Sequence, residues 1–191
     1  MWLDRNLGAT QVATSGTDSA AYGDLYQWGR ATDGHELRTS ATTATLATTI
    51  SPGANTFVTN STAPYDWTSA DSAGSSRVSA WADGGANDIC PAGFSVPTIA
   101  ELIADTVHDG TYTGSNDITN SATAFSSFLK IPVAGDRIRM GGALVDVGSF
   151  VSLWSRSANG LDARRVGFSS GVASIFSDNR SFGLSVRCIK D

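Results

Sequence analysis

The sequence predicts an α+β fold in which irregular loops and one or two helices precede a small antiparallel sheet. Three observations support this class. The clearest helical pattern lies mid-chain at residues 98–107, and short apolar runs separated by turns fill residues 128–190. Ser, Thr and Gly are abundant, whereas charged residues make up only 16% of the chain. Helices and strands that segregate along the sequence are typical of α+β domains.

The length of 191 residues is sufficient for one domain with a sizeable core. We expect a single domain over residues 1–191, with a Thr/Ser-rich loop insertion at about residues 38–83. The net charge is −5 and Lys and Arg form no cluster, which argues against nucleic acid as a partner. No apolar run reaches the length of a membrane span, so we expect no membrane insertion.

Aromatic residues mark the N-terminal part and the insertion. Tyr22, Leu25 and Trp28 follow one another at intervals of three, which predicts one short helix or turn with these side chains on a single face. The insertion contains Pro and Gly breakers but few bulky residues, so we expect a packed irregular loop. Its expected anchors are Phe57, Tyr65, Trp67 and Trp81.

The segment CPAGFSVPTIAELIADTVHD carries the clearest local signals. A short strand over residues 94–96 is expected to end at Pro97. Thr98 then has the pattern of an N-cap, with Glu101 three residues later as its capping-box partner. The following helix would end at Gly110 and bury one apolar face, formed by Ile99, Leu102, Ile103 and Val107.

The second half of the chain predicts strands and tight turns. Residues 128–135 predict an apolar strand, and the pair Gly141-Gly142 predicts the turn of a β-hairpin. Short turns separate the remaining strands, which we expect at residues 151–157, 163–170, 172–178 and 184–190.

The two cysteines, Cys90 and Cys188, lie far apart in the sequence. A disulfide between them and two buried free thiols are both compatible with the sequence. The disulfide would stabilise the fold by about 4 kcal/mol in the chain-entropy model. No cysteine or histidine lies at metal-ligand spacing from another, so we expect no zinc site.

The chain lacks the residue patterns of common catalytic sites. A Ser-His-Asp arrangement would need His35 or His108, the two histidines. We expect His108 at the end of a helix and His35 in a polar turn, both in structural or solvated roles. The carboxylates Asp24, Asp33 and Glu36 have no spacing that indicates acid–base chemistry. We therefore predict that the protein is not an enzyme.

Six segments, in order along the chain, resemble one protein family: WLDRNLGAT, YGDLYQWGR, CPAGFSVPTIAEL, LKIPVAGDR, VGSFVSLWSRS and FGLSVRCIKD. The chain is similar to the Fibrobacter-type major paralogous domain, a surface module of bacteria and phages. Its wider relatives are formylglycine-generating-enzyme-like proteins and the variable proteins of diversity-generating retroelements. The resemblance covers nearly the whole chain except residues 38–80. It implies a C-type lectin-like fold and an extracellular place, on a virion tail or a bacterial cell surface.

The resemblance implies that most of these residues are scaffold. The final strand, residues 184–190, would run through the middle of the sheet and support the strands and loops between residues 154 and 181. Relatives that oxidise thiols carry two neighbouring cysteines near the C-terminal end, whereas Cys188 has no such neighbour. Core positions implied by the resemblance are Trp2, Trp28, Phe94, Pro97, Trp154 and Cys188.

Many lectin-like folds bind calcium through carboxylate and amide oxygens. Asp83, Asn87 and Asp88 offer such oxygens within one short segment, but the same pattern commonly forms Asx-turns without a metal. The Glu-Pro-Asn and Trp-Asn-Asp motifs of calcium-dependent lectins do not occur in this sequence. We therefore expect no cofactor, with calcium at this segment as the remaining alternative.

Residues 150–178 carry a mixture of side chains where the relatives would have strands rich in Tyr and Asn. The framework between them keeps its expected type. Because side chains alternate along a strand, Val166 and Phe168 can fill the core while Arg165 and Gly167 face outward. The resemblance implies a binding surface diversified by a retroelement. The other interpretation is a set of ordinary solvent-facing residues.

We predict that outward side chains of this segment bind a ligand. The candidate set is Ser152, Leu153, Arg156, Ser157, Leu161, Asp162, Arg165, Gly167, Ser169, Val172, Ser174, Phe176 and Asp178. Binding faces use a few large anchors among polar residues; here the anchors would be Leu153, Arg156, Leu161, Arg165 and Phe176. Two arginines in an acidic chain favour a ligand with carboxylates or a partly anionic protein or glycan surface.

Two functions of different classes follow. The first is a non-catalytic receptor-binding domain that binds a host cell-surface protein or glycan, at the tip of a phage tail fibre. The alternative is a structural module that caps a fibre and sets its trimeric register. In that case the insertion at residues 38–83 would be the interface of a homotrimer, and residues 150–178 would bind nothing.

Overall fold

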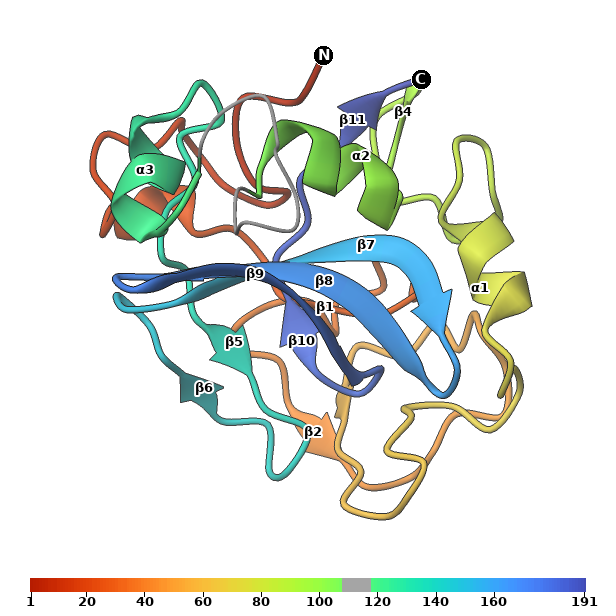
Figure 1. The fold of residues 1–191 in the computed structure, drawn as a ribbon. Helices are drawn as coiled ribbons and strands as arrows, with labels where there is room; N and C mark the ends of the chain where they lie inside the picture. The colour runs from red at the N-terminus through yellow and green to blue at the C-terminus, as the bar shows by residue number, and fades with distance from the viewer. Residues whose placement is uncertain (108–117) are drawn as a thin grey trace.

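A computed structural model describes residues 1–107 and 118–191. Within these residues it shows the predicted α+β class, with three short α-helices and sheets that are antiparallel except for one two-stranded pair. Figure 1 shows the layers: strands β7, β8 and β9 cross the middle of the molecule, α2 and α3 lie above them, and β1, β5 and β10 lie below.

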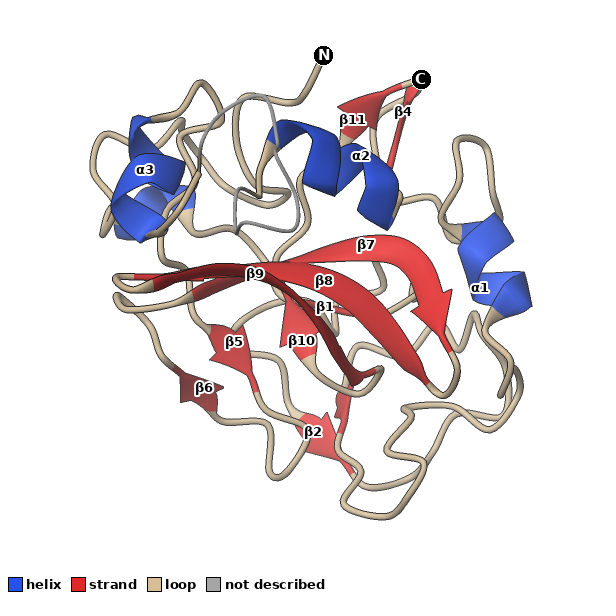
Figure 2. Cartoon of the chain, viewed as in Figure 1, coloured by secondary structure: helices blue, strands red, loops and turns tan. Residues whose placement is uncertain are grey.

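Most strands are very short. The helical elements are the 3₁₀ turn η1 (Ser19–Ala21), α1 (Ser75–Ala80), α2 (Ile99–Asp105) and α3 (Ser121–Ser126). The strands, red in Figure 2, are β1 (Tyr26–Gln27), β2 (Thr42–Thr43), β3 (Phe57–Val58), β4 (Phe94–Ser95), β5 (Asp136–Arg137), β6 (Leu144–Val145), β7 (Val151–Asn159), β8 (Asp162–Ser169), β9 (Val172–Asn179), β10 (Gly183–Leu184) and β11 (Ile189–Lys190). Loop hydrogen bonds and side-chain packing therefore hold much of the fold.

The three long strands form one antiparallel sheet with β8 at its centre and β9 at an edge. Alternation gives this sheet two faces. We call them the helix-facing side and the lower side, after their positions in Figure 1. The helix-facing side contributes to the first core cluster with Val151, Leu153, Val166, Phe168 and Ala173, which pack with Leu102 of α2 and Ala124 of α3. From the strand register, the lower side carries Ser152, Trp154, Arg165, Gly167, Ser174, Phe176 and Asp178.

A second core lies below the sheet and is rich in tryptophan. Trp28, Trp67, Trp81 and Trp154 are each completely buried. Each indole N–H donates to a backbone carbonyl oxygen, those of Ser155, Trp28, Arg30 and Tyr26 respectively, at 2.8–3.0 Å. A buried indole needs such an acceptor, so the four rings fix loop backbones as well as filling volume.

The C-terminal segment joins several parts of the fold, although not as the single strand expected over residues 184–190. Strand β10 lies between β1 and β5 in the four-stranded sheet, and Ser185 bridges to Leu153 of β7. Further along, β11 pairs with β4, and Ile189 also pairs with Trp2 near the N-terminus. The last residues thus support the long sheet from below and fasten the first residues to it.

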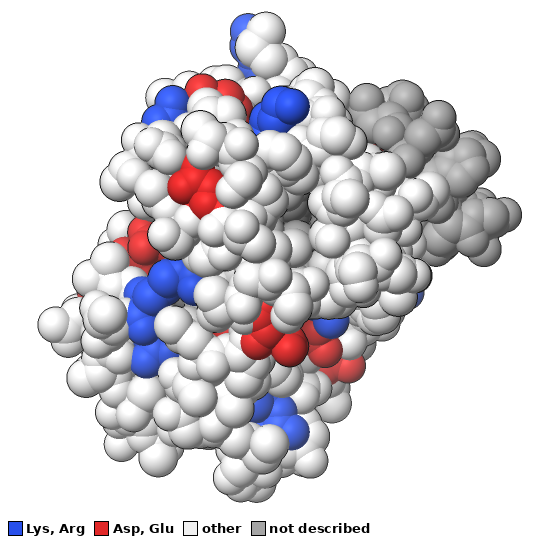
Figure 3. All heavy atoms as spheres, turned by 90° about the vertical axis from the view of Figure 1, so that its left-hand side faces the viewer, with Lys and Arg blue, Asp and Glu red and all other residues white. Residues whose placement is uncertain are grey.

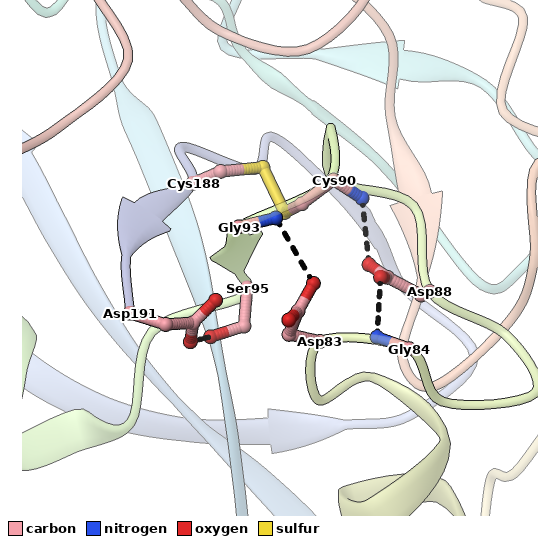
Figure 4. The surroundings of a disulfide bond; sticks show 8 residues. All are labelled: Asp83, Gly84, Asp88, Cys90, Gly93, Ser95, Cys188 and Asp191. Carbon is pink, nitrogen blue, oxygen red and sulfur yellow. Dashed lines mark hydrogen bonds between the residues drawn. A yellow bond between two sulfur atoms is a disulfide. The ribbon is translucent and has the colours of Figure 1, made fainter.

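Cys90 and Cys188 form a disulfide, which decides between the two alternatives left open by the sequence. The bond ties the segment before β4 to the segment before β11 (Figure 4). Disulfides persist in oxidising surroundings, so this bond points to an oxidising compartment. None of the described helices has both the length and the apolar character to cross a bilayer.

Helix α2 confirms the strongest local prediction. Thr98 is the N-cap, its side chain accepts from the Glu101 N–H, and the Glu101 side chain accepts from the Thr98 N–H. The helix ends at Asp105, with Thr106 as its C-cap, whereas the sequence predicted an end at Gly110. Gly110 and His108 lie outside the described residues.

Four sequence-based expectations were wrong. Residues 184–190 form no single strand, because β10 and β11 lie in different sheets and residues 186–188 are not in a strand. Residues 128–135 form no strand, although Ile131 and Val133 are buried there. The preceding helix α3 was not predicted; Asn120 caps it through the Thr123 N–H. Tyr22, Leu25 and Trp28 are all buried, but no single helix carries them, because the chain turns into strand β1 and distributes these side chains between both cores.

The insertion at residues 38–83 is ordered and packed, with β2, β3 and α1 in it. It contributes most of a buried ion network, the Arg77 network, made of Asp66, Asp71, Arg77 and Arg180. Arg77 reaches both carboxylate oxygens of Asp66, at 2.7 and 2.6 Å, and its guanidinium lies over the Trp28 and Trp67 rings. The network fastens the insertion to Arg180, just after β9.

Candidate functional site

The thirteen candidate residues divide by their position in the sheet. Leu153 is 1% exposed and lies on the helix-facing side opposite Val166, so it belongs to the core and is not an exposed anchor. This corrects the sequence prediction, since Ser152 and Leu153 are neighbours in one strand and must face opposite ways. Ser152 and Gly167, on the lower side, are also buried.

The two exposed apolar candidates lie at the hairpin turns. Leu161, at the β7–β8 turn, is 54% exposed, and Val172, after the β8–β9 turn, is 40% exposed. Strand β8 separates them by about 25 Å, because a strand rises about 3.3 Å per residue. They cannot contact the same small group. Asp162 and Ser169, at the two ends of β8, are partly buried.

Arg156 and Ser157 lie where the β7–β8 register shifts, beyond Trp154. Here the regular pairing of β7 with β8 is interrupted, and β7 contacts the start of helix α2 instead. The Arg156 N–H donates to the Pro97 carbonyl at 2.8 Å, and the Ser157 hydroxyl accepts from the Ile99 N–H at 3.0 Å. Ser157 therefore satisfies one of the free N–H groups at the helix start. Both residues are partly buried.

The structure gathers the remaining candidates around Arg165. Its guanidinium lies 4.4 Å from the centre of the Phe176 ring and 5.5 Å from that of Phe150. Its Nε forms an ion pair with Asp178 on the edge strand. Ser174 is another partly buried residue of β9, on the same side of the sheet. We call Asp136, Phe150, Arg165, Phe176 and Asp178 the Arg165 cluster.

Gly167 provides the space that the Arg165 side chain occupies. A Cβ on Gly167 would collide with Nη1 of Arg165 and would lie 2.7 Å from the Phe150 ring. The guanidinium and this ring thus cover the Gly167 backbone. Across the ladder, Gly167 pairs with Ser152, whose hydroxyl donates to Asp136 Oδ2 at 2.8 Å. One cross-strand pair therefore brings Asp136 and Arg165 to the same part of the sheet.

Two polar atoms of the cluster have no hydrogen-bond partner among the described residues. They are Oδ1 of Asp136 and Nη1 of Arg165, and both are inaccessible to solvent. Asp136 is 8% and Arg165 9% exposed. Burial raises the pKa of the Asp136 carboxyl to about 6; Asp178 and Asp146 also raise it, whereas Ser152 and Arg165 lower it.

Sequence reasoning missed Asp136 and Phe150. Asp136 follows Gly135, whose N–H donates to the Phe150 carbonyl at 2.8 Å, and this bond places both residues beside β7. Gly135 has a φ of 72°, and a Cβ there would lie 2.5 Å from the Val145 carbonyl oxygen, so only glycine fits. The glycine before Asp136 was therefore an available signal for a close backbone approach.

His35, Asp33 and Glu36 also converge, with ligand-type atoms within 4.8 Å of one another. Nε2 of His35 accepts the Gln27 N–H at 3.0 Å, so the ring proton is on Nδ1, which lies 2.7 Å from Asp33. Burial lowers the pKa of His35 and keeps it neutral. Neither ring nitrogen of His35 has a lone pair left for a metal. The three residues therefore stabilise the loop that follows β1, and His35 is buried and not solvated.

The alternative calcium ligands have backbone partners. Figure 4 shows Asp83 accepting from the Gly93 N–H and Asp88 accepting from the N–H groups of Gly84 and Cys90. Asn87 is turned inward, is 1% exposed and donates to the Gly29 and Ile50 carbonyls. These bonds are typical of loop-forming Asx residues. The described contacts thus use these three side chains to support the disulfide loop.

Positively and negatively charged side chains are mixed on the face of the molecule that forms the left-hand side of Figure 1. Figure 3 shows single basic and acidic side chains scattered over this face, without an extended patch of one sign. An interspersed surface gives no long-range attraction for a polyanion or polycation. This face therefore offers a ligand only short-range contacts with individual side chains.

Comparison with family models, with curated proteins and with solved structures finds no match for this chain.

Proposed function

We propose that this protein is a non-catalytic ligand-binding domain and that the Arg165 cluster is the centre of its binding face. One observation carries the proposal: a buried Arg and a buried Asp keep unpartnered polar atoms beside a half-buried aromatic residue of an edge strand. Buried polar groups in folded proteins are nearly always hydrogen bonded, and exceptions concentrate at functional sites.

The sheet that holds the cluster suits a binding face. The helix-facing sides of β7 and β8 are sealed by Val151, Val166 and Phe168, each 0% exposed. Phe176 and Asp178 of β9 project to the lower side, at the edge of the same sheet. A rigid strand that positions a few partly exposed side chains reduces the entropy lost on binding.

The class of ligand follows from the resemblance to surface modules of bacteria and phages. We propose a C-type lectin-like fold, an extracellular place on a virion tail or bacterial surface, and a host surface glycan or protein as ligand. The disulfide and the α+β arrangement support this setting. Arg165 is already paired with Asp178, so it offers little net charge, and the expectation of an anionic ligand loses its main support.

The fibre-capping alternative has support from the insertion. Leu46 is 38% exposed and borders a hollow of about 280 Å³, together with Pro64 and Thr68. An exposed apolar side chain beside a hollow is compatible with a contact between copies of the chain. This function predicts a homotrimer that Leu46→Asp dissociates, which analytical ultracentrifugation would measure.

The binding proposal is tested with labelled protein and a pair of matched variants. We would measure binding of the fluorescent domain to intact bacterial strains and to arrayed bacterial surface glycans and proteins. Phe176→Ala should weaken binding by about tenfold or more, as truncation of a central anchor does. The control Leu144→Ala removes a similarly sized apolar side chain that is 41% exposed on β6, and binding should not change.

The same measurements can contradict the proposal. Binding of the wild-type domain to none of the cells or arrayed molecules would reject a receptor-binding function. Equal loss of binding in both variants, or no loss in either, would show that the face is elsewhere.

A further inference from the structure

We propose that Asp136 and Arg165 form a hydroxyl-binding subsite for a neutral sugar, flanked by the Phe150 and Phe176 rings. This inference rests on the proposed function and deepens it, because it names the ligand class and the two atoms that recognise it. The atoms are Oδ1 of Asp136, an acceptor, and Nη1 of Arg165, a donor.

The first argument is what each of the two side chains lacks. Asp136 uses Oδ2 to accept from the Ser152 hydroxyl, and its other oxygen is unpartnered. Arg165 uses Nε for Asp178, and Nη1 is unpartnered. An unpaired buried polar atom lowers the stability of the folded state, and more so if the group is charged. A ligand that supplies both missing partners would recover this loss on binding.

The second argument is that the two atoms belong to one place. Nη1 of Arg165 lies over Gly167, and Gly167 is paired across the ladder with Ser152, the residue that holds Asp136. The coulombic effect of Arg165 on Asp136 is consistent with this proximity. The missing partners are therefore one donor for the carboxylate and one acceptor for the guanidinium, both beside the Ser152–Gly167 pair.

A hydroxyl group meets both requirements, because it donates one hydrogen bond and accepts others. Sugars carry several hydroxyls next to apolar C–H faces, and these faces pack on aromatic rings. Phe150 and Phe176 border the guanidinium and provide such rings. A carbohydrate therefore fits the cluster in both its polar and its apolar parts.

The charge of the cluster favours a neutral ligand. Asp178 from β9 already neutralises Arg165, and Asp136 from β5 adds a second carboxylate. Asp146, after β6, is a third acidic group close enough to affect Asp136, while Ser152 of β7 contributes only a hydroxyl. Two carboxylates thus lie in the cluster with one guanidinium, a third acts on Asp136 from nearby, and a ligand carboxylate would be repelled. The site should reject acidic sugars.

Access to the two atoms is through the edge strand. Both atoms are covered, whereas the Asp178 side chain is 29% exposed and Phe176 is only partly buried on β9. The Phe176 ring lies against the Arg165 guanidinium and belongs to the edge strand, on the side of the sheet opposite the helices. We infer that the ligand displaces this ring and then packs against it.

The experiment is a titration of the ¹⁵N-labelled full chain with the methyl glycosides of glucose, mannose, galactose and N-acetylglucosamine, each to tens of millimolar. At least one glycoside should shift the amide signals of Gly167, Phe176 and Asp178 with saturation. Methyl sialoside and acetate, the anionic probes, should leave these signals in place. Shifts with anionic probes alone would overturn the proposal, as would no shift with any glycoside.

Variants identify the atoms. Asp136→Asn keeps an acceptor for Ser152 and should weaken glycoside binding by about tenfold, the loss of one charge-assisted hydrogen bond. Arg165→Gln should do the same, and Leu161→Ala, at the distant exposed turn, should bind like the wild type. Dispersed amide spectra establish that the variants fold. Unchanged binding in both Asp136→Asn and Arg165→Gln would reject the subsite.

The pH dependence of glycoside binding tests the role of the Asp136 carboxylate. Protonation of Asp136 near pH 6 removes the charged acceptor, so glycoside binding should weaken from about pH 7.5 to pH 5 in the wild type and stay level in Asp136→Asn. A wild-type profile that stays level would overturn the role of Asp136. If the glycosides fail but the domain still binds cells or arrayed proteins, the sugar subsite is rejected and the proposed function stands. Failure of every probe rejects both.

Discussion

Arg77 and Arg165 occupy similar surroundings but differ in how completely they are hydrogen bonded. Both guanidinium groups are buried, both lie over aromatic rings, and both pair with Asp. All three guanidinium nitrogens of Arg77 have acceptors on Asp66 or Asp71. In the Arg165 cluster, Nη1 of Arg165 and Oδ1 of Asp136 have none among the described residues.

This difference separates scaffold from candidate site. In a completely hydrogen-bonded ion network, every donor and acceptor is used within the protein, so the network stabilises the fold and offers none to a ligand. In a partly hydrogen-bonded cluster, the unpartnered donors and acceptors can bind groups of a ligand. If the distinction is right, substitutions in the Arg77 network must destabilise the fold strongly, whereas those in the Arg165 cluster must leave its stability little changed or raise it. Each prediction below tests or refines that contrast.

The largest expected effect is common to both regions. Replacing Cys90 and Cys188 by Ser opens a long covalent loop and should lower the free energy of unfolding by about 4–5 kcal/mol. Cys188 lies between β10 and β11 and packs in the same core cluster as Trp28 and Trp154. Urea denaturation would measure the loss. A change below about 1 kcal/mol would show that the terminal segment is held by its packing alone.

Next is Arg77→Met, which leaves Asp66 and Asp71 buried with fewer partners. We expect the free energy of unfolding to fall by about 3–5 kcal/mol, the usual effect of removing one member of a buried ion pair. Arg5→Met is the matched control, because Arg5 is 39% exposed and its ion pair with Asp4 lies at the surface; its effect on stability should be much smaller than that of Arg77→Met. Equal losses would contradict a scaffold role for the network.

Asp136→Asn should have the opposite sign. The folded-state pKa of Asp136, about 6, lies above the 3.8 of an unperturbed Asp, so the folded protein holds this proton more tightly than the unfolded chain. Its contribution to stability is complete below about pH 4 and is lost as pH rises through about 6. The variant should therefore be more stable than the wild type by about 3 kcal/mol at pH 7 and close to it near pH 4.

Two features make this pH test selective. Burial also raises the pKa of Asp24 to about 6. Asp24 is present in both the wild type and the variant, so its effect on stability cancels in their difference. In Asp18, hydrogen bonds from Thr14 and Gln11 lower the pKa to about 2, so Asp18→Asn should destabilise the fold at pH 7 and lose this effect in acid. Thermal unfolding across this pH range would measure both. Destabilisation by Asp136→Asn at pH 7 would assign Asp136 to the scaffold.

The smallest expected effect is that of Arg165→Gln. The change removes one unpartnered buried donor and leaves Asp178, at 29% exposure, able to bind water. The two effects oppose each other, so the free energy of unfolding should change by less than about 1 kcal/mol. Chemical denaturation beside Arg77→Met compares the two arginines directly. Similar large losses would remove the contrast on which the candidate site depends.

Local rules predicted the elements that local residues determine. The capping pair of Thr98 and Glu101 located the start of α2, and Gly141-Gly142 located the β5–β6 hairpin. The 128–135 strand failed because its apolar side chains pack into the core without pairing partners. Apolar content alone cannot distinguish a buried strand from a buried loop.

The Arg165 cluster was predictable only in part. Alternation correctly placed Val166 and Phe168 on the side of the sheet opposite Arg165, and the same rule would have removed Leu153 from the list. The expectation that Arg165 and Gly167 face outward was wrong, because both are buried on the lower side of the sheet. Asp136 could not be found this way, because it reaches the cluster from another sheet through Ser152. The state of hydrogen bonding at each atom is a tertiary property, and composition or spacing does not contain it.

The chain fastens its beginning to its end. Leu3 and Leu7 donate their N–H groups to the carbonyls of Cys188 and Val186, both at 3.0 Å. During synthesis, these two N–H groups lack their acceptors until the segment from about residue 183 has left the ribosome. The protein therefore completes its fold only after that segment emerges, because the pairing of the first residues with the last is its longest-range contact.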